Sequence, residues 1–475
     1  MDPILFWNEV ALEANRVSFT NDAKEQPGPT LSSRALAIVH LAIYDAFAGV
    51  HGFPTTPVAL PKYNTLLTAP TLEAGANKDD NAAVAVAAAA HATLSKLYPS
   101  QKAFFIAKHN EANLSKVKTK NGQDFGKLVA KTLLAERSID GNASDDGYSI
   151  SVQQGAHRSD PDNPGQPFHG AFYGALTRTF AVKKRHQILA PHSVGSVPYN
   201  KSFDQVAGKG IAPGLMGTVP ASIDKRTADQ TIMGIFWAYD GAQKIGTPPR
   251  LYNQIIRAIA AAQKTTPAEN ARLFALVNAA MGDAGILAWT EKYRYEFWRP
   301  VVGIREDPDR PDSGWLPLGA PSSNPDKDCL QMGVKPTQND SVKNSTPPFP
   351  AYPSGHATFG AAVFTIAELY FKDIRKGVHV ATGLKFVSDE LDGKSTDNRG
   401  AIRPRIERTF AGGFDQMIKE NGLSRIYLGV HWSFDAFALD DNDDPDLNQN
   451  IGGVPLGINI AKDIYTNKMK KSNIL

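Results

Sequence analysis

The sequence contains very little cysteine. Cys329 is the single one among 475 residues. An intrachain disulfide, a zinc cluster built on thiolates and an iron–sulfur ligand set all need more than one cysteine, so the sequence excludes them. Packing of the side chains must therefore hold the fold together.

Long apolar runs and a strong excess of charge of one sign are also missing. The stretch AAVAVAAAAHATL, which begins at Ala82, is too short to span a bilayer and is interrupted by His91. The formal net charge is +3, and no block of clustered Lys and Arg residues occurs. We therefore expect neither a membrane nor a nucleic acid as a partner.

The first residues carry acidic side chains and no secretory signal. Asp2, Glu9 and Glu13 stand where a signal peptide has a basic segment followed by an apolar run. We expect a cytoplasmic protein or one exported without a leader.

Alternating strand patterns are scarce, and helical periodicity dominates. Apolar residues recur at three- and four-residue spacings in 31–50, 100–119, 122–138, 251–263 and 268–300. Two stretches rich in Gly, Pro, Asp and Ser, 145–225 and 306–353, are typical of long irregular connections. The sequence predicts an all-α fold of two helical bundles, joined and wrapped by long loops, with an N-terminal bundle in 1–200 and a C-terminal, site-bearing bundle in 201–475.

The segment KYRYEFWRP places two cations seven residues apart, at Lys292 and Arg299. This spacing is about two turns of a helix, so we expect both side chains on one face. Arg offers a planar fork for two oxygens of an oxyanion, and Lys offers a point charge. By itself the spacing more often marks a solvated helix face than a site.

The segment PFPAYPSGHATFGAAVF has the pattern of a helix start that binds an anion. Ser354 is suited to cap the helix, and Gly355 lets an anion approach the exposed N–H groups at its positive end. His356 follows in the first turn, where it could move a proton. The competing interpretation is an ordinary capped helix with an incidental histidine.

The segment SRIYLGVHWSFD carries a histidine and an aspartate four residues apart. We expect His431 and Asp435 on one helical face, so that the carboxylate orients the imidazole. Arg425 stands six residues before His431, and we expect it in the approach to that helix, turned inward. A lone histidine among Val, Trp and Phe is more often a satisfied core residue than a ligand.

Taken together, the three segments resemble the signature shared by vanadium haloperoxidases and type 2 phosphatidic-acid-phosphatase-like acid phosphatases. FWAYDG, IGTPPR, FWRP, LGAP and PPFPAYPSGHATFG resemble vanadium chloroperoxidases in particular, as do FWNEVALEANRV and SRALAIVHLAIYDA near the start. The likeness covers most of the chain. This chain looks shorter than that family, which leaves its loops, channel shape and oligomeric state open.

The resemblance implies a cofactor, namely one vanadate ion per chain. His431 would be the metal ligand, coordinating vanadium through a ring nitrogen. The oxygens of vanadate would be held by Lys292, Arg299, Arg425, Ser354 and the amide of Gly355. Asp435 would support His431, and Asp240 would pair with Arg425.

The resemblance also implies roles in catalysis. His356 would take a proton from hydrogen peroxide, Lys292 would activate a peroxide oxygen, and His431 would complete the catalytic set. Trp289 and Phe349 would shape the halide pocket, and bromoperoxidases carry a histidine where Phe349 stands. The expected activity is a haloperoxidase that oxidises chloride and bromide with hydrogen peroxide to hypohalous acid, which then halogenates small organic acceptors.

Two other functions stay open at this point. An acid phosphatase of the same superfamily could use His431 as nucleophile and His356 as the acid for the leaving group. A non-catalytic helical scaffold could retain a relic of the site. Trp289, Phe349 and the long insert between Pro300 and Pro353 favour the peroxidase.

Overall fold

The structure is a computed structural model that describes residues 1–475 except 22, 24, 53–59, 113–117, 167, 325–344, 378, 441, 443, 473 and 475. In this part of the chain helices dominate, and the strands form two small antiparallel pairs. The predicted all-α class is confirmed. Cys329 lies outside the described residues.

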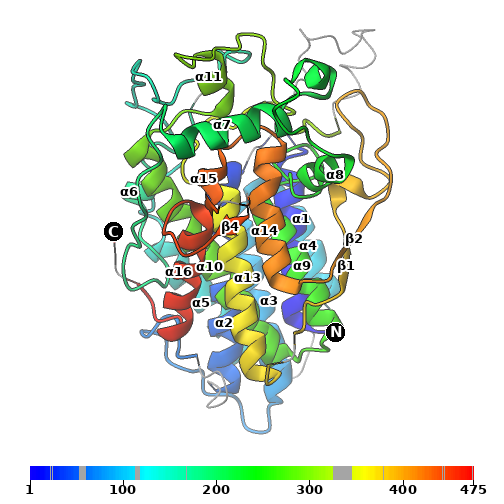
Figure 1. Ribbon diagram of the computed structural model, residues 1–475. Coiled ribbons are helices and arrows are strands. Elements are labelled where there is room, and N and C mark those ends of the chain that lie inside the picture. The colour runs from blue at the N-terminus through cyan, green and yellow to red at the C-terminus, as the bar shows by residue number, and fades with distance from the viewer. Residues whose placement is uncertain are drawn as a thin grey trace.

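Helices occur along the whole length of the described chain (Figure 1). The α-helices are α1 Pro3–Ser18, α2 Gly28–His51, α3 Lys78–Leu97, α4 Lys102–Glu111, α5 Lys120–Glu136, α6 Tyr173–Leu176, α7 Val197–Lys209, α8 Ala228–Phe236, α9 Pro248–Ala262, α10 Pro267–Tyr295, α11 Pro300–Arg305, α13 Gly355–Ile374, α14 Gly413–Tyr427, α15 Ser433–Ala436 and α16 Gly453–Thr466. The shorter elements are η1 Pro99–Gln101, η2 Pro213–Thr218, η3 Asp389–Leu391, β1 Leu384–Val387, β2 Glu407–Phe410, β3 Ala438–Leu439 and β4 Pro445–Asp446.

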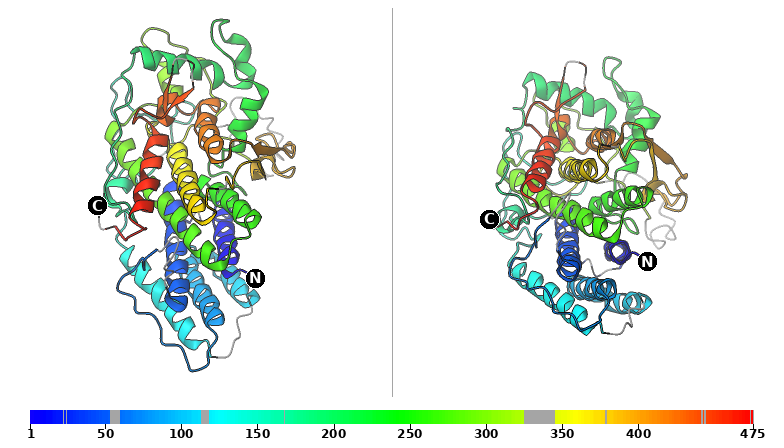
Figure 2. Two further views of the ribbon diagram at one scale, coloured as in Figure 1. Left: turned by 60° about the horizontal axis from the view of Figure 1, so that its bottom comes forward. Right: turned by 90° about the horizontal axis from the view of Figure 1, so that it is seen from below.

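Helix α10 is the central element of the packing. It begins with a capping box in which the Thr266 side chain accepts from the Glu269 N–H and the Glu269 carboxylate accepts from the Thr266 N–H. Along its length α10 packs against both α2 and α13. Gly285 permits this close approach, because a Cβ there would lie 3.0 Å from Ser33 Oγ and 3.3 Å from the Phe359 ring. Figure 2 shows the blue and cyan N-terminal helices on one side and the yellow to red helices on the other.

The two predicted bundles share one apolar core. Buried side chains of α2 and α3 belong to the same cluster as those of α10, α13, α14 and α16. This core connects the helices on both sides of residue 200. The predicted boundary between a bundle in 1–200 and a bundle in 201–475 stays a prediction.

The long helix predicted over 268–300 is shorter than expected. It ends at Tyr295 because Glu296 adopts the left-handed conformation, with φ 47°, and Pro300 then starts α11. The expectation that Lys292 and Arg299 share one helical face is therefore wrong. The stretch 145–225, predicted to be irregular, contains α6 and α7.

Helices α2 and α10 are long and apolar enough to span a membrane by length and composition alone. In each, 94% of the most apolar window is buried inside the molecule. Core helices pass the same test, so this is weak evidence, and the expected absence of a membrane partner stays a prediction.

The contact between α13 and α16 gives a stability prediction. A Cβ at Gly457 would lie 2.8 Å from both Ala361 Cβ and Ala362 N. Gly457→Ala should destabilise the protein by about 1–3 kcal/mol, because two close-packed helices must separate. Gly217→Ala is the matched control: nothing lies near its added Cβ, so a change of no more than about 0.5 kcal/mol is expected. Denaturant unfolding measures both, and equal effects would contradict the packing argument.

Candidate active site

The three sequence segments meet around one cavity, although they are far apart in the chain. Its volume is about 210 Å³. The predicted site residues that line it are Trp289, Phe349, Gly355, His356, Arg425, His431 and Asp240. Lys292, Arg299, Ser354 and Asp435 do not line it and are buried.

Lys292 lies in the last turn of α10 and is completely buried. Its Nζ donates hydrogen bonds to three main-chain carbonyls, those of Pro350 (2.7 Å), Ala351 (3.0 Å) and Pro353 (2.6 Å). Burial, together with the nearby Arg299 cation, lowers the pKa of Lys292 well below its usual value. The ammonium group is thus held in place by carbonyl dipoles, and no carboxylate among the described residues is hydrogen-bonded to it.

Arg299 precedes α11 and reaches toward the third segment. Its Nε donates to the Phe349 carbonyl (2.9 Å), and its Nη1 lies 2.7 Å from the Val430 carbonyl and 2.9 Å from His431 Nε2. The remaining nitrogen, Nη2, is buried and has no partner in the described structure. Burial lowers the pKa of Arg299 to about 9.

Arg425 forms a bidentate ion pair with Asp240. Its Nη1 and Nη2 lie 3.1 Å and 2.8 Å from the two carboxylate oxygens. Its Nε is buried without a partner among the described residues. This pairing is the one that the resemblance implied.

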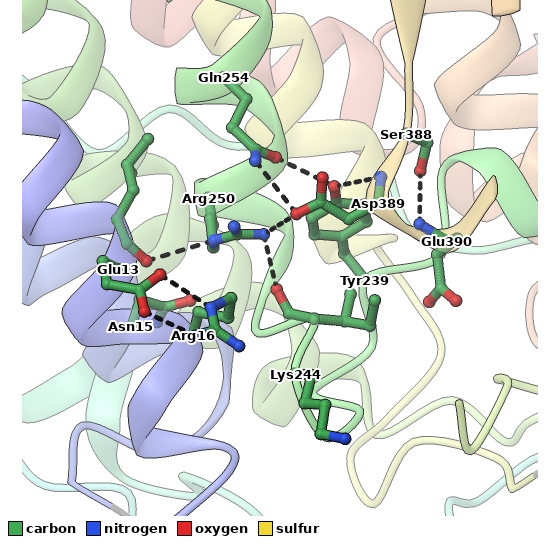
Figure 3. Close-up of polar contacts among 12 residues, drawn as sticks. Glu13, Asn15, Arg16, Tyr239, Lys244, Arg250, Gln254, Ser388, Asp389 and Glu390 are labelled. Atoms are coloured by element: carbon green, nitrogen blue, oxygen red, sulfur yellow. Dashed lines mark hydrogen bonds and ion pairs between the residues drawn. The ribbon is translucent and has the colours of Figure 1, made fainter. Parts of the chain in front are cut away.

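A polar network around Tyr239, the residue before Asp240, links the loop to Arg250 and Asp389 (Figure 3). Tyr239 adopts φ 44°, which is uncommon for a residue with a side chain. Its hydroxyl accepts from the Asp389 N–H (2.9 Å). Arg250 on α9 pairs with the Asp389 carboxylate and donates to the Ile245 carbonyl (3.0 Å). Contacts from α9 and η3 therefore fix the main chain next to Asp240, whose carboxylate pairs with Arg425.

The hydrogen bonds of His431 determine its protonation state. Nδ1 lies 2.8 Å from the Asp435 carboxylate, which also accepts from the Trp432 N–H (3.0 Å). Because a carboxylate accepts, Nδ1 carries the proton and Nε2 keeps its lone pair. Burial first, and then Arg299, lowers the pKa of His431 well below its usual value. The side chain therefore offers a neutral ring nitrogen as a ligand.

The helix start is built as the sequence predicts. Ser354 is the N-cap of α13, and its Oγ accepts from the Ala357 N–H (3.3 Å). Gly355 lies against the indole, since a Cβ there would be 3.1 Å from the Trp289 ring. The positive end of α13 thus faces the cavity.

His356 is the opposite neutral tautomer from His431. Its Nε2 lies 2.8 Å from the Ala238 carbonyl, which can only accept, so Nε2 carries the proton and Nδ1 keeps a lone pair. Asp240 Oδ1 lies 3.8 Å from Nε2. Burial first, and then Arg425, lowers the pKa of His356 to about 3, so the ring is neutral at ordinary pH.

Trp289 and Phe349 form the aromatic wall of the cavity. Their ring centroids are 4.7 Å apart. Lys292 Nζ lies 5.5 Å from the Trp289 centroid and 5.2 Å from the Phe349 centroid. The aromatic faces therefore stabilise the buried ammonium.

These groups are suited to hold a tetrahedral oxyanion such as vanadate. Two arginine nitrogens, Arg299 Nη2 and Arg425 Nε, are buried without partners among the described residues. Buried donors of this kind indicate a missing ligand or water. In the described residues no group of three His, Cys, Asp or Glu side chains could chelate a cation. The donors present thus fit an anion with one histidine ligand.

The third segment differs from its predicted local structure. Arg425 lies in the last turn of α14, and His431 lies in the turn between α14 and α15. The expected helical face shared by His431 and Asp435 is therefore wrong. The chain turns at Gly429, with φ 71°, where a Cβ would meet the Pro317 side chain at 3.0 Å.

Sequence reasoning missed the part of the cavity wall that comes from the N-terminal half of the chain. This wall includes Phe19, Gly28, Pro29 and His169. Phe19 ends α1, Gly28 and Pro29 start α2, and His169 lies in an irregular stretch. No local pattern marks these residues, because only the tertiary fold brings them to the site.

The comparisons with known proteins agree on one family. The family model "Vanadium chloroperoxidase N-terminal domain" matches residues 1–169, and "VCPO second helical-bundle domain" matches residues 272–440. Vanadium chloroperoxidase from Curvularia inaequalis is 36% identical to this chain, over 98% of the chain and 90% of the relative. The chain belongs to the vanadium chloroperoxidase family.

Solved structures support the fold of this family member. A bacterial vanadium-dependent iodoperoxidase matches with a TM-score of 0.65 and 18% identity, over 98% of this chain and 96% of that chain. An apo-type bacterial vanadium-dependent chloroperoxidase matches with a TM-score of 0.62 and 16% identity, over 96% and 98% respectively. At such identities the likeness shows the fold alone.

Binding of the oxyanion should stabilise the protein. Orthovanadate at about a hundredfold above its dissociation constant should add about 2.7 kcal/mol to the free energy of unfolding. His431→Ala should lose most of this gain, because its ring nitrogen would be the ligand, which the cations cannot replace. The control His379→Gln changes an exposed histidine. This variant should keep the full stabilisation by orthovanadate. Thermal unfolding with and without vanadate measures the effect, and an undiminished gain in His431→Ala would contradict the assignment.

Proposed function

We propose that this chain binds one orthovanadate ion and uses hydrogen peroxide to oxidise chloride and bromide to hypohalous acid. Membership of the vanadium chloroperoxidase family supports this function. The observation that carries it is the pair of buried nitrogens, Arg299 Nη2 and Arg425 Nε, that have no partner among the described residues. Arg299 also contacts His431, and Arg425 and His431 line the same cavity. An oxyanion would satisfy both.

The residues that would hold vanadate are the three cations, the start of α13 and His431. Vanadate, when bound, supplies a Lewis acid that polarises peroxide without a change of its oxidation state. Lys292, Arg299 and Arg425 neutralise the oxygens, so that a second anion is less strongly repelled. The lone pair on His431 Nε2 is the ligand, because Asp435 holds the proton on Nδ1.

His356 is the group suited to remove a proton from arriving peroxide. Its Nδ1 is the free base atom, since Nε2 donates to the Ala238 carbonyl. Three carbonyls orient Lys292, and its charge would help to polarise peroxide bound in the site. Trp289 and Phe349 keep water away from the halide, which makes nucleophilic attack easier.

The test of this function is reconstitution with a defined cofactor. The purified protein with orthovanadate and peroxide should oxidise iodide, bromide and chloride, and vanadate-free protein should not. Phosphate-ester hydrolysis by the vanadate-free protein is measured in parallel. Phosphatase turnover without any vanadate-dependent halide oxidation would overturn the proposal in favour of the acid phosphatase.

A second prediction separates binding from turnover. His356→Ala should bind orthovanadate nearly as well as the wild type, because His356 hydrogen-bonds to the Ala238 carbonyl and is not needed to pair the cations. Bromide turnover should fall by about a hundredfold to ten-thousandfold through the loss of the base. Calorimetric titration with vanadate and steady-state rates measure the two quantities. Parallel losses in both would assign His356 a structural role.

A further inference from the structure

His169 forms part of the cavity wall beside the aromatic pair Trp289 and Phe349. Its ring centroid lies 6.4 Å from that of Trp289 and 6.2 Å from that of Phe349. The roles described above do not use this side chain. An imidazole from the N-terminal half of the chain therefore lies beside Trp289 and Phe349, the aromatic wall of the cavity.

The position of His169 is fixed by its main chain. Its N–H donates to the Pro348 carbonyl (2.8 Å), and its carbonyl accepts from Trp289 Nε1 (3.1 Å) and from the Tyr293 hydroxyl (2.8 Å). Gly28, with φ +66°, leaves room for the ring, because a Cβ there would lie 2.5 Å from His169 Nε2. The ring is thus held beside the cavity, as a preorganised binding group must be.

Thr30 determines which ring nitrogen carries the proton. Its Oγ1 lies 3.1 Å from His169 Nε2, and the Thr30 side chain is completely buried. In the described structure this hydroxyl makes no other hydrogen bond. We assign the hydroxyl as the donor in this contact. Nε2 then accepts the hydrogen bond, and Nδ1 carries the ring proton. Nδ1 then remains as a donor without a partner among the described residues.

Other donors near the aromatic wall are already used. Trp289 Nε1 and the Tyr293 hydroxyl donate to the His169 carbonyl, and Lys292 Nζ is surrounded by three carbonyls. A halide that leaves water for an apolar pocket needs a hydrogen-bond donor, because burying an unpaired charge is costly. The Nδ1–H group of His169 is available for this purpose.

We propose that His169 contacts the halide substrate directly and that its Nδ1–H group donates a hydrogen bond to chloride or bromide in the cavity, beside the aromatic wall of Trp289 and Phe349. This inference rests on the proposed haloperoxidase function. Burial lowers the pKa of His169 to about 4, although Asp145 opposes this shift. The donor is therefore neutral near pH 7, and it orients the halide without adding a fourth cation.

Two substitutions distinguish the two ring nitrogens. His169→Asn places its amide nitrogen close to the position of Nδ1, whereas His169→Gln places it close to that of Nε2. His169→Gln should raise the KM for bromide by about tenfold or more, the usual effect of losing a hydrogen bond to a charged group. His169→Asn should stay within about threefold of the wild type. The KM for peroxide and the affinity for vanadate should change little in either variant.

The outcomes separate halide contact from a structural role. If the ring serves only to satisfy Thr30, the order reverses: Gln preserves the KM for bromide and Asn raises it, which would overturn the proposal. An unchanged KM for bromide in both variants would also overturn it. The control His379→Gln, at an exposed histidine, should match the wild type.

A diffraction experiment gives a readout that is independent of activity. Crystals of the vanadate-free protein soaked in bromide should show an anomalous peak within hydrogen-bond distance of His169 Nδ1, and this peak should be lost in His169→Gln. A second peak beside Arg299 and Arg425 is compatible with the proposal, because their free donors attract any anion. The absence of a peak at His169 Nδ1 would overturn the proposal. If the wild type binds bromide at Nδ1 but oxidises no halide with vanadate, the proposed function fails and the contact stands.

Discussion

Burial of three cations around one cavity is the constraint on which the rest of this site depends. Lys292, Arg299 and Arg425 are each exposed by no more than 1%. Among the described residues, Arg425 has a carboxylate partner, Asp240, and the other two cations have none. Removing such charges from water costs several kcal/mol for each ion unless other groups compensate. Main-chain carbonyls supply part of this compensation, and the partnerless nitrogens of Arg299 and Arg425 are left to pair with an anion. The fold must therefore place these carbonyls correctly, and they come from the short stretch 349–353 before α13 and from Val430.

His431 and His356 are opposite neutral tautomers, because their hydrogen-bond partners differ. A carboxylate at Nδ1 of His431 leaves the lone pair on Nε2, whereas a carbonyl at Nε2 of His356 leaves it on Nδ1. The low pKa of both rings, due mainly to burial, keeps them neutral. Two chemically identical side chains are thereby suited to two tasks, one to bind a metal and the other to accept a proton.

Predictions from the sequence succeeded where local chemistry decides the structure and were wrong where the backbone changes direction. The cap at Ser354 depends on residues within one turn, so its pattern is readable, and the structure confirms it. The end of α10 depends on a left-handed Glu296, a conformation that no sequence signal marks. Arg425 and His431 were likewise assigned to the wrong local elements. Their roles still rest on the family resemblance, because a motif preserves which residues meet and not how the backbone brings them together.

The N-terminal half of the chain contributes a neutral wall to a site whose charge comes entirely from the C-terminal half. This division has a physical reason. A further cation beside Phe349 would hold halide tightly, but it would also compete for the oxyanion and raise the cost of burial. Tight ground-state binding of a substrate does not speed its reaction once the site is saturated. A neutral N–H group at His169 gives the halide a direction at little electrostatic cost. The irregular segment that carries His169, and the start of α2 that makes room for it, thus belong to the site as much as the three motifs do.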